Sequence, residues 1–466
     1  MLASFGLSLN AQNPLLWGMT NAGGTDSLGT IFKISGDGTG FVSLQSLSAA
    51  TGNSPTGTLL HANNAKFYGL TSTGGANTKG TIISLDTSNV MTDVHDFSGI
   101  AGNAPLGKLL QANNGNLYGM TFYDDSIGAG VIFKYNPVNN SYAKLVTFNG
   151  TGNGQSPRGS LMQASNGKIY GMCQGGGANQ YGTLFSFDTT NNTVTNLHSF
   201  DLATGFNPFG DLIQASNGLL YGLCMYFGTS GPGTIFSFDP TSNIYSDLIH
   251  FATTNGGFPE GSLIQATNGK LYGLTSGGGD SVGGVLFSYD IAGNTITDVA
   301  VFHCSNGFRP KGSLIQASDS NLYGMTSMGG AHNLGTVFRF NIAADTLITI
   351  HSFDGTDGSA PAGSLIEALT PPVVHAGIGS LPTAINTINI YPNPTSSSIT
   401  ITLPFSITSK NSIINFYDIL GEKVLPSYST QSLQTTIDLS SLSQGIYFLE
   451  VITDVEWTVR KVVKIN

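Results

Sequence analysis

The chain has 466 residues, a formal net charge of −10 and only 9% charged residues, whereas Gly occupies 62 positions. A single hydrophobic core of ordinary size is excluded at this length, and a hydrophobic content of 40% is too high for a disordered chain. Several domains or a repeat array are therefore expected. The scattered Lys and Arg residues argue against nucleic-acid binding, and the sequence lacks the run of about 18 apolar residues that a membrane-spanning helix needs.

The N-terminal segment 1–12 reads MLASFGLSLNAQ, a short apolar stretch that ends in small and polar residues. We expect it to be the remnant of a secretory signal peptide, and a frayed first strand is the alternative. Cys173, Cys224 and Cys304 form no CxxC pair and no disulfide framework. Cysteine usage therefore leaves the compartment undecided.

Two sequence markers recur in register along most of the chain. The first is an aromatic residue followed by Gly, and successive copies lie 51, 50, 52, 51, 51 and 51 residues apart. These pairs begin at Trp17, Tyr68, Tyr118, Tyr170, Tyr221, Tyr272 and Tyr323. The second marker is Pro-x-Gly, which begins at Pro55, Pro105, Pro157, Pro208, Pro259, Pro310 and Pro361. Such periodicity indicates one supersecondary unit repeated seven times.

Each unit contains four short apolar segments, as residues 259–302 illustrate. PEGSLIQATNG ends in an Asn-Gly turn signal, KLYGLTS and VLFSYD alternate as half-buried strands do, and ITDVAVF follows a further turn. No window has helical spacing. Four strands in about 50 residues are typical of a β-propeller blade, and we place the GSLIQA strands innermost and the VAVF strands outermost.

The two ends of the repeat region predict a closed ring. The first unit begins at 14–17 without a GSLIQA strand, and residues 363–368 repeat that strand alone after the seventh unit. Pairing between these ends would remove exposed sheet edges. We therefore predict an all-β fold with a seven-bladed β-propeller at 13–370, closed by a C-terminal strand.

The units resemble a family of glycine-rich tandem repeats of about 50 residues known as GloVer repeats. The resemblance rests on LIQASNGKLYGLTSGGG-like and GTLFSFD-like segments and spans about residues 14–370. This family carries no settled activity, so the resemblance implies the repeat type and not a reaction.

The composition changes at 369–372, and we interpret 371–387 as a linker. Residues 388–466 contain alternating strand patterns bounded by Pro, Asn, Ser or Gly, in segments such as INIYPNPTSSSITITL and GIYFLEVIT. The pattern predicts a small antiparallel Ig-like β-sandwich. An ordinary accessory sandwich is one interpretation of this domain.

Residues 388–466 closely resemble the type A sorting domain of the type IX secretion system of Bacteroidota. The residues that carry the match are Tyr391, Pro392, Asn393, Pro394, Gly421, Gly445, Tyr447, Arg460, Lys461 and Lys464. The resemblance implies signal-peptide-dependent export to the periplasm, passage across the outer membrane by the type IX machinery, and release or attachment to the cell surface. We expect Gly421 and Gly445 to occupy hairpin positions with positive φ.

Several features that suggest chemistry have simpler interpretations. The Gly-rich loops precede strands and not helices, so we interpret them as turns and not phosphate sites. The polar residue that ends the third strand of six units is interpreted as a turn former; these residues are Asp86, Asn136, Asp188, Asp239, Asp290 and Asn341. His95, His198 and His351 are expected on separate outer strands, too far apart to share a metal. We predict no metal and no cofactor.

The middle residue of Pro-x-Gly varies between units, whereas its Pro and Gly do not. This is expected where loops on one face of a scaffold form a binding surface, and sequence drift on an exposed loop is the alternative. Aromatic residues beside charges suit stacking on sugar rings. The candidate binding residues are Arg158, Phe209, Glu260, Arg309 and Lys311.

No catalytic set is evident, and we expect a monomeric, non-catalytic secreted or surface propeller that binds extracellular glycan or protein. One alternative is a polysaccharide hydrolase or lyase that uses Asp124, Asp125 and Glu260, because unit three replaces its loop glycines with acidic residues. A structural surface component is the other. An axial pocket lined by residues that differ between units favours the enzyme, and a uniform shallow face favours binding or structure.

Overall fold

The computed structural model divides into two compact units, residues 1–370 and 371–466. It describes residues 13–368 apart from 87, 229 and 230, and, in the second unit, 389–402, 412–418, 423–430, 434–452 and 457–465. The expected signal-peptide remnant at 1–12 and linker at 371–387 lie outside the described residues. Among the helices of the described residues, none is long and apolar enough to cross a membrane.

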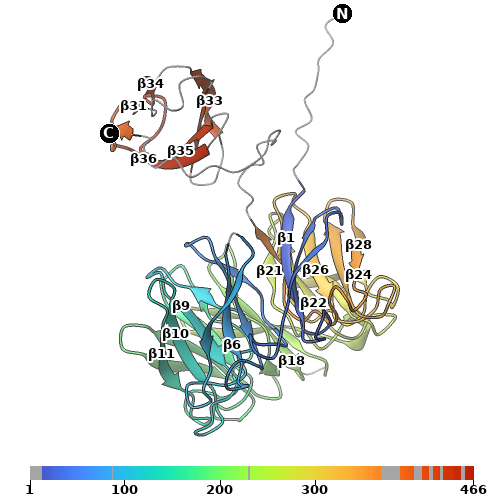
Figure 1. The fold of residues 1–466 in the computed structure, drawn as a ribbon. Helices are drawn as coiled ribbons and strands as arrows, with labels where there is room; N and C mark the ends of the chain where they lie inside the picture. Colours follow the sequence, from blue (N-terminus) through green and yellow to red (C-terminus); the bar gives the residue numbers. More distant parts are fainter. Residues whose placement is uncertain are drawn as a thin grey trace, which may run out of the picture. The chain divides into compact units, whose positions relative to one another are not determined.

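The first unit consists of seven antiparallel sheets, numbered here in chain order (Figure 1). Sheet 1 contains β29 (Ile366–Ala368), β1 (Leu15–Thr20), β2 (Thr30–Ser35) and β3 (Val42–Ser46). Sheet 2 contains β4 (Leu60–His61), β5 (Phe67–Thr71), β6 (Thr81–Leu85) and β7 (Met91–Asp96). Sheet 3 contains β8 (Leu110–Gln111), β9 (Leu117–Thr121), β10 (Val131–Asn136) and β11 (Ser141–Thr147). Sheet 4 contains β12 (Met162–Gln163), β13 (Ile169–Cys173), β14 (Thr183–Asp188) and β15 (Thr193–Ser199).

The remaining sheets follow the same order, with one addition. Sheet 5 contains β16 (Phe206–Pro208), β17 (Ile213–Gln214), β18 (Leu220–Tyr226), β19 (Thr234–Asp239) and β20 (Ile244–His250). Sheet 6 contains β21 (Ile264–Gln265), β22 (Leu271–Thr275), β23 (Val285–Asp290) and β24 (Thr295–Val301), after a short 3-10 turn at Thr253–Asn255. Sheet 7 contains β25 (Ile315–Gln316), β26 (Leu322–Thr326), β27 (Thr336–Asn341) and β28 (Thr346–Ser352). The VAVF-type strand lies at the edge of each sheet, as predicted.

The Asn-Gly and Tyr-Gly signals have a shared physical basis, which sheet 6 illustrates. Asn268 accepts a hydrogen bond from the Lys270 amide (3.1 Å) and donates one to the Tyr272 hydroxyl (2.9 Å). The next residue is Gly273, where a Cβ atom would clash with the ring of Phe287. The motif therefore combines a turn, a hydrogen-bonded buried Tyr and space for the Phe of the third strand.

Seven hydrophobic clusters join each sheet to the next one around the unit. The cluster between sheets 1 and 2 contains Trp17 and Phe67, and the equivalent cluster between sheets 7 and 1 contains Tyr323 and Phe32. The other five clusters join the intervening pairs of sheets. In Figure 1 the blue strand β1 accordingly lies beside the orange strands of sheet 7. The hydrophobic core thus consists of clusters between neighbouring sheets, and the last cluster joins sheet 7 to sheet 1.

The pairing between the two ends of the repeat region is present. Leu15, Leu16 and Trp17 of β1 pair with Ala368, Glu367 and Ile366 of β29. Sheet 1 thereby receives its innermost strand from the end of the repeat region, as predicted. Because β29 pairs with β1, the inner side of β1 is not an open sheet edge.

The Gly of every Pro-x-Gly motif packs against the backbone of the equivalent Gly in the next sheet. A Cβ atom on Gly261, for example, would clash with the carbonyl oxygen of Gly312. The same relation runs through the whole set and returns from the last member to the first, in the order Gly57, Gly107, Gly159, Gly210, Gly261, Gly312, Gly363, Gly57. We call these seven residues the glycine ring; a side chain at any of them requires the neighbouring backbone to move.

Replacement of a ring glycine is therefore expected to destabilise the unit. Gly261→Ala inserts a methyl group into a backbone contact that cannot be relieved by rotating a side chain, with an expected loss of about 1–3 kcal/mol in the free energy of unfolding. Gly293→Ala is the matched control, because a Cβ atom there meets its neighbours at 3.4 Å or more. Urea denaturation of the full chain compares them, and equal stability of the two variants contradicts the packing argument.

Three outer-strand histidines stack on an aromatic residue of the following sheet. His95 lies 3.9 Å from Tyr142, His198 lies 3.8 Å from Tyr245 and His351 lies 3.9 Å from Phe41, each measured between ring centroids. They pack at the interfaces between sheets and remain partly exposed, as positions on edge strands predict. Burial lowers the pKa of both His95 and His198 from the ordinary histidine value.

The lowered pKa of His198 predicts a loss of stability in acid. Below the ordinary histidine pKa of about 6.5 the unfolded chain binds a proton that the buried imidazole resists, although nearby Asp201 partly favours the charged form. His198→Phe retains the stack and removes this proton, so its melting temperature should fall less than that of the wild type between pH 7.5 and 5. The exposed His332, replaced by Gln, serves as the control. Identical pH dependence of wild type and His198→Phe contradicts the assignment.

The second unit consists of two antiparallel sheets with a shared core. One contains β30 (Asn389–Tyr391), β31 (Ser398–Thr402) and β34 (Gln434–Asp438), and the other contains β33 (Lys423–Thr430), β32 (Ser412–Tyr417), β35 (Gly445–Ile452) and β36 (Trp457–Lys464). Ile399, Phe416 and Leu449 belong to the single hydrophobic cluster between them. One expectation is wrong: Gly445 begins β35 without a positive φ, because it is already in the strand and not in its turn.

Candidate functional site

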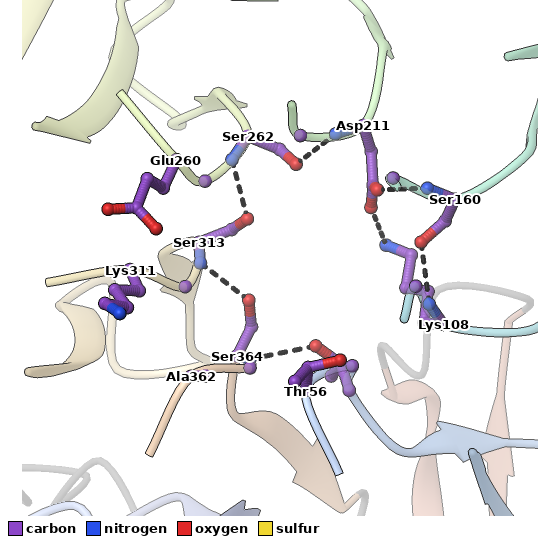
Figure 2. A pocket seen from close by; sticks show the side chains of 18 of the residues that line it. Thr56, Lys108, Ser160, Asp211, Glu260, Ser262, Lys311, Ser313, Ala362 and Ser364 are labelled. Carbon is purple, nitrogen blue, oxygen red and sulfur yellow. Dashed lines mark hydrogen bonds and ion pairs between the residues drawn. The ribbon is translucent and has the colours of Figure 1, made fainter. Parts of the chain in front are cut away.

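A ring of hydrogen bonds lies directly beside the glycine ring (Figure 2). The residue after six of the seven glycines donates its amide N–H to the side-chain oxygen of the equivalent residue in the next sheet. The six bonds run from Lys108 to Ser160, Ser160 to Asp211, Asp211 to Ser262, Ser262 to Ser313, Ser313 to Ser364 and Ser364 to Thr58, at 2.6–2.9 Å. These hydrogen bonds fix the loop backbones around the axis of the glycine ring. The variable residue before each glycine therefore projects from a defined position.

The ring departs from its repeating pattern at two charged members. The side chain of Lys108 has no acceptor atom, so among the described residues the amide of Thr58 has no equivalent partner in the next sheet. Its ammonium group instead lies 3.3 Å from Asp211. The Asp211 carboxylate therefore contacts the Ser160 amide and Lys108 together, and one carboxylate of the axis is neutralised within the protein.

The variable residues of Pro-x-Gly converge on one cavity of about 970 Å³ at the axis. The seven residues are Thr56, Leu106, Arg158, Phe209, Glu260, Lys311 and Ala362. The sequence predicted a display face, and the structure brings every one of these positions, with Arg309, to the same opening. Its lining differs between units, which is the arrangement that the sequence argument associated with an enzyme.

Arg158 is a partly buried cation of this cavity. Its guanidinium carbon lies 4.0 Å above the ring of Phe209, a cation–π contact. Burial lowers the pKa of Arg158, and the negative charge of Glu260 opposes that change. Arg158 and Glu260 therefore interact electrostatically across the cavity, although they arise from loops that enter sheets 4 and 6.

A second cavity of about 500 Å³ adjoins the axial one. Glu260, Arg309 and Lys311 line both cavities, and Tyr226 and Phe258 line the second. We call this second cavity the side groove. Figure 2 shows Glu260 and Lys311 on the same side of the axial ring, pointing away from the serine hydroxyls.

The loops that enter the sheets share a left-handed residue immediately before the proline. Its φ lies between 49° and 61° in all seven loops, at Ser54, Ala104, Ser156, Asn207, Phe258, Arg309 and Ala360. Left-handed backbone is unusual for bulky residues. Because Ala and Ser adopt it at equivalent positions, the conformation belongs to the loop architecture, and Phe258 and Arg309 are displayed by it.

The structure also identifies an aromatic cluster that the sequence argument missed. Sheet 5 pairs Phe206 with Tyr226 across β16 and β18, with ring centroids 5.5 Å apart. Tyr226 also contacts Phe258 at 5.8 Å, and Phe227 contacts Phe206 at 5.1 Å. The replacement of loop glycines, such as Gly277 and Gly278 of unit six, by Tyr226 and Phe227 was visible in the sequence, but its partner strand was not.

The acidic loop of unit three does not contribute to this site. Asp124 is 2% exposed, and its carboxylate accepts hydrogen bonds from Ser126 and Ala129 in its own loop. Burial alone would raise the pKa of Asp124, but these hydrogen bonds outweigh burial and lower it. Asp125 lies 3.5 Å from Lys79. Neither acid lines the axial cavity or the side groove, so the suggested grouping with Glu260 is wrong.

The remaining candidates have structural roles. Each polar residue that ends a third strand accepts a hydrogen bond from the amide two or three residues later, as Asp290 does from Ala292 at 2.9 Å. Cys173 and Cys224 are buried free thiols in the slot that Thr occupies in the other sheets. Among the described residues, no group of three or more His, Cys, Asp or Glu side chains is placed to hold a metal ion.

Comparison with known proteins now identifies the repeats. The model of the Gloeobacter/Verrucomicrobia repeat matches residues 3–164, 109–266 and 163–370. The chain belongs to this repeat family. The model of the secretion system C-terminal sorting domain matches residues 389–466, so the repeats are joined to a type IX secretion sorting domain. No curated protein matches the sequence.

Solved structures support the fold of this repeat protein. A putative 6-phosphogluconolactonase from Bacteroides fragilis is 14% identical, with 78% of this chain and 99% of that chain covered and a TM-score of 0.53. A putative 6-phosphogluconolactonase from Bacteroides uniformis is 13% identical, covers 77% of this chain and 100% of that chain, and has a TM-score of 0.52. At these identities the likeness shows a β-propeller-like fold and carries no activity.

In the sorting domain, the two ends of the predicted motif lie together. Asn393 donates a hydrogen bond to the Lys461 carbonyl (2.7 Å) and accepts one from the Val463 amide (2.8 Å). The Lys464 ammonium donates to the Ser396 carbonyl at 2.7 Å, and the Tyr447 hydroxyl donates to the Ser443 carbonyl at 2.8 Å. These residues therefore stabilise the domain. Tyr391, Pro392, Pro394, Arg460 and Lys461 lie on the same two segments, and Gly421 lies outside the described residues.

The sorting domain supports secretion or surface display by the type IX system. Removal of residues 388–466 should leave the protein in the periplasm of a host with an active type IX system, because the machinery loses its recognition element. Immunoblots of periplasm, outer membrane and medium measure this, with the full chain and a periplasmic marker as controls. Undiminished protein outside the cell contradicts this role.

Proposed function

We propose that the repeats form a seven-bladed propeller, at 13–370, that binds an extracellular ligand in its axial cavity without catalysing a reaction. Residues 371–387 would be the linker to a small Ig-like sandwich at 388–466 that is recognised by the type IX machinery. The protein would act as a monomer, after signal-peptide-dependent export, either released or attached to the outer-membrane surface. Glycan and protein are the two ligand classes that the site suits.

The convergence of the seven variable residues carries this proposal. The glycine ring and the adjoining hydrogen bonds hold the loop backbones alike, while the side chain between Pro and Gly changes from Thr to Leu, Arg, Phe, Glu, Lys and Ala. An invariant frame with a different residue at each position is typical of recognition sites on rigid scaffolds. Random drift on exposed loops does not explain why the variable side chains meet in one cavity.

Catalysis is the second candidate, because the cavity is lined by unit-specific polar residues. Two acids line it, and Asp211 is engaged by Lys108 and the Ser160 amide. Among the described residues, Glu260 is then the carboxylate of the axial lining that has no ion pair within 4 Å. Glycoside hydrolysis ordinarily requires a pair of carboxylates. Binding is therefore better supported than hydrolysis, and a lyase or hydrolase would depend on Glu260.

The full chain should bind at least one member of a panel of bacterial, algal and plant polysaccharides and extracellular proteins without releasing products. Arg158→Gln removes the cation that stacks on Phe209 and should weaken binding by about tenfold, the effect of losing one charged hydrogen bond. Lys168→Gln, on the exposed turn of sheet 4, is the matched control. Calorimetry measures affinity, and chromatography of the supernatant measures products.

Each outcome of this panel separates the candidates. Product release that disappears in Glu260→Gln supports the enzyme and overturns the non-catalytic proposal. Absence of binding to every member supports a structural surface component. Equal binding by wild type and Arg158→Gln moves the site away from the axial cavity.

A further inference from the structure

The side groove contains cations that the protein itself does not neutralise. Among the described residues, Arg309 and Lys311 have no carboxylate within 4 Å. The nearby Glu260 interacts with Arg158 from the axial side. The chain as a whole has 17 basic and 27 acidic residues, so a local excess of positive charge opposes the general composition and favours an anionic ligand.

Backbone hydrogen bonds fix the loop positions from which Arg309 and Phe258 project. The Arg309 amide donates to the Gly283 carbonyl at 2.8 Å, and the Arg309 carbonyl accepts a hydrogen bond from the Ser327 hydroxyl at 2.8 Å. Phe258 is held in the same way, by the Pro232 carbonyl (2.6 Å) and the Ser276 hydroxyl (2.9 Å). Ordered loops lower the entropy lost on binding.

Aromatic rings line the same groove as the cations. Phe258 is 37% exposed, and its ring lies 5.8 Å from that of Tyr226, which in turn stacks on Phe206. The exposed Phe258 ring, packed T-shaped against Tyr226, presents an apolar surface in a groove that charged groups also line. Sugars combine apolar ring faces with polar edges, so this surface suits a saccharide better than a fully polar anion.

We infer that the side groove binds an anionic glycan, whose carboxylate or sulfate groups contact Arg309 and Lys311 while a sugar ring packs against Phe258 and Tyr226. This inference rests on the proposed binding function and names its ligand class. The groove joins the axial cavity through Glu260, Arg309 and Lys311, so consecutive sugar units would occupy both cavities. Glu260, located between them, would accept hydrogen bonds from sugar hydroxyls.

An acidic peptide is the competing ligand for two cations. It would use the charges but would gain little from the exposed face of Phe258. The joint volume of the two cavities, about 970 and 500 Å³, also exceeds what a single acidic side chain fills. The combination of cations, aromatic rings and two joined cavities therefore favours a glycan chain.

Four compounds test the inference on the full chain: sodium polygalacturonate, dextran sulfate, neutral dextran and polyglutamate. Isothermal titration calorimetry should detect polygalacturonate or dextran sulfate, with affinity that falls as salt is raised, and weaker or no binding of dextran and polyglutamate. Binding of one polyanion and not the other distinguishes carboxylate from sulfate recognition.

The variant Arg309→Gln/Lys311→Gln should weaken binding of the anionic glycan about tenfold or more. Lys168→Gln/Lys270→Gln is the matched control, because it also removes two positive charges. Its residues lie on turns of sheets 4 and 6, at the strand ends opposite to those that face the side groove. Lys270 precedes β22 and Ser276 follows it, a separation of about 20 Å along the strand. Phe258→Ala should weaken polygalacturonate binding without changing its salt dependence.

The outcomes that overturn this inference differ from those that overturn the proposed function. If dextran binds as tightly as polygalacturonate and Arg158→Gln still weakens that binding, the inference of an anionic ligand is overturned. The axial binding site of the proposed function is then retained. Polyglutamate binding in preference to the glycans identifies a peptide ligand instead. Failure of all four compounds to bind overturns the inference, whereas the broader panel of polysaccharides and proteins decides the proposed function. Unchanged melting temperatures of the variants show that folding is not the cause.

Discussion

The close contact of seven glycines around the axis is the constraint on which the repeat unit depends. Each glycine lies against the carbonyl group of its counterpart in the next sheet, and the set closes from Gly363 to Gly57. Backbone contact of this kind leaves no room for a Cβ atom and fixes how closely the inner strands approach. The hydrophobic clusters between sheets can then form at equal spacing, and β29 is brought to β1 without a separate closing element.

This constraint separates the residues that build the fold from those that are free to vary. Pro and Gly fix the loop, and the left-handed residue before Pro donates its amide to the long loop of the preceding sheet, as Ala104 does to Lys79. The residue between Pro and Gly makes none of these backbone-determined contacts. Its side chain can therefore change between units at little cost in stability, and this freedom places Arg158, Phe209, Glu260 and Lys311 around one cavity.

Much of this organisation could be predicted from sequence because the repeat markers record local requirements. Turn signals and strand alternation lie within one unit, so the sheet composition and the β1–β29 pairing followed from them. The partners of the ring glycines lie in the next unit, about 50 residues away, and periodicity alone does not identify them. The two errors have another cause: hydrogen bonds within its own loop hold Asp124, and pairing with Lys464 places Gly445 in a strand, and neither contact is recorded by the repeat markers.

The asymmetry of sheets 5 and 6 arises from a departure within this regular frame. In other units the segment after the second strand makes an isolated bridge to the entering loop, as Asn103 does with Tyr123. In sheet 5 the same contact extends into the β16–β18 ladder and carries Phe206 and Tyr226. The positive φ before Pro occurs in all seven loops, so it cannot account for a difference between them. The difference lies in which side chains that shared geometry presents: Phe258 and Arg309 at this location, and Ala, Ser or Asn in the other loops. Specificity can thus be altered by single side chains while the backbone that supports them stays the same.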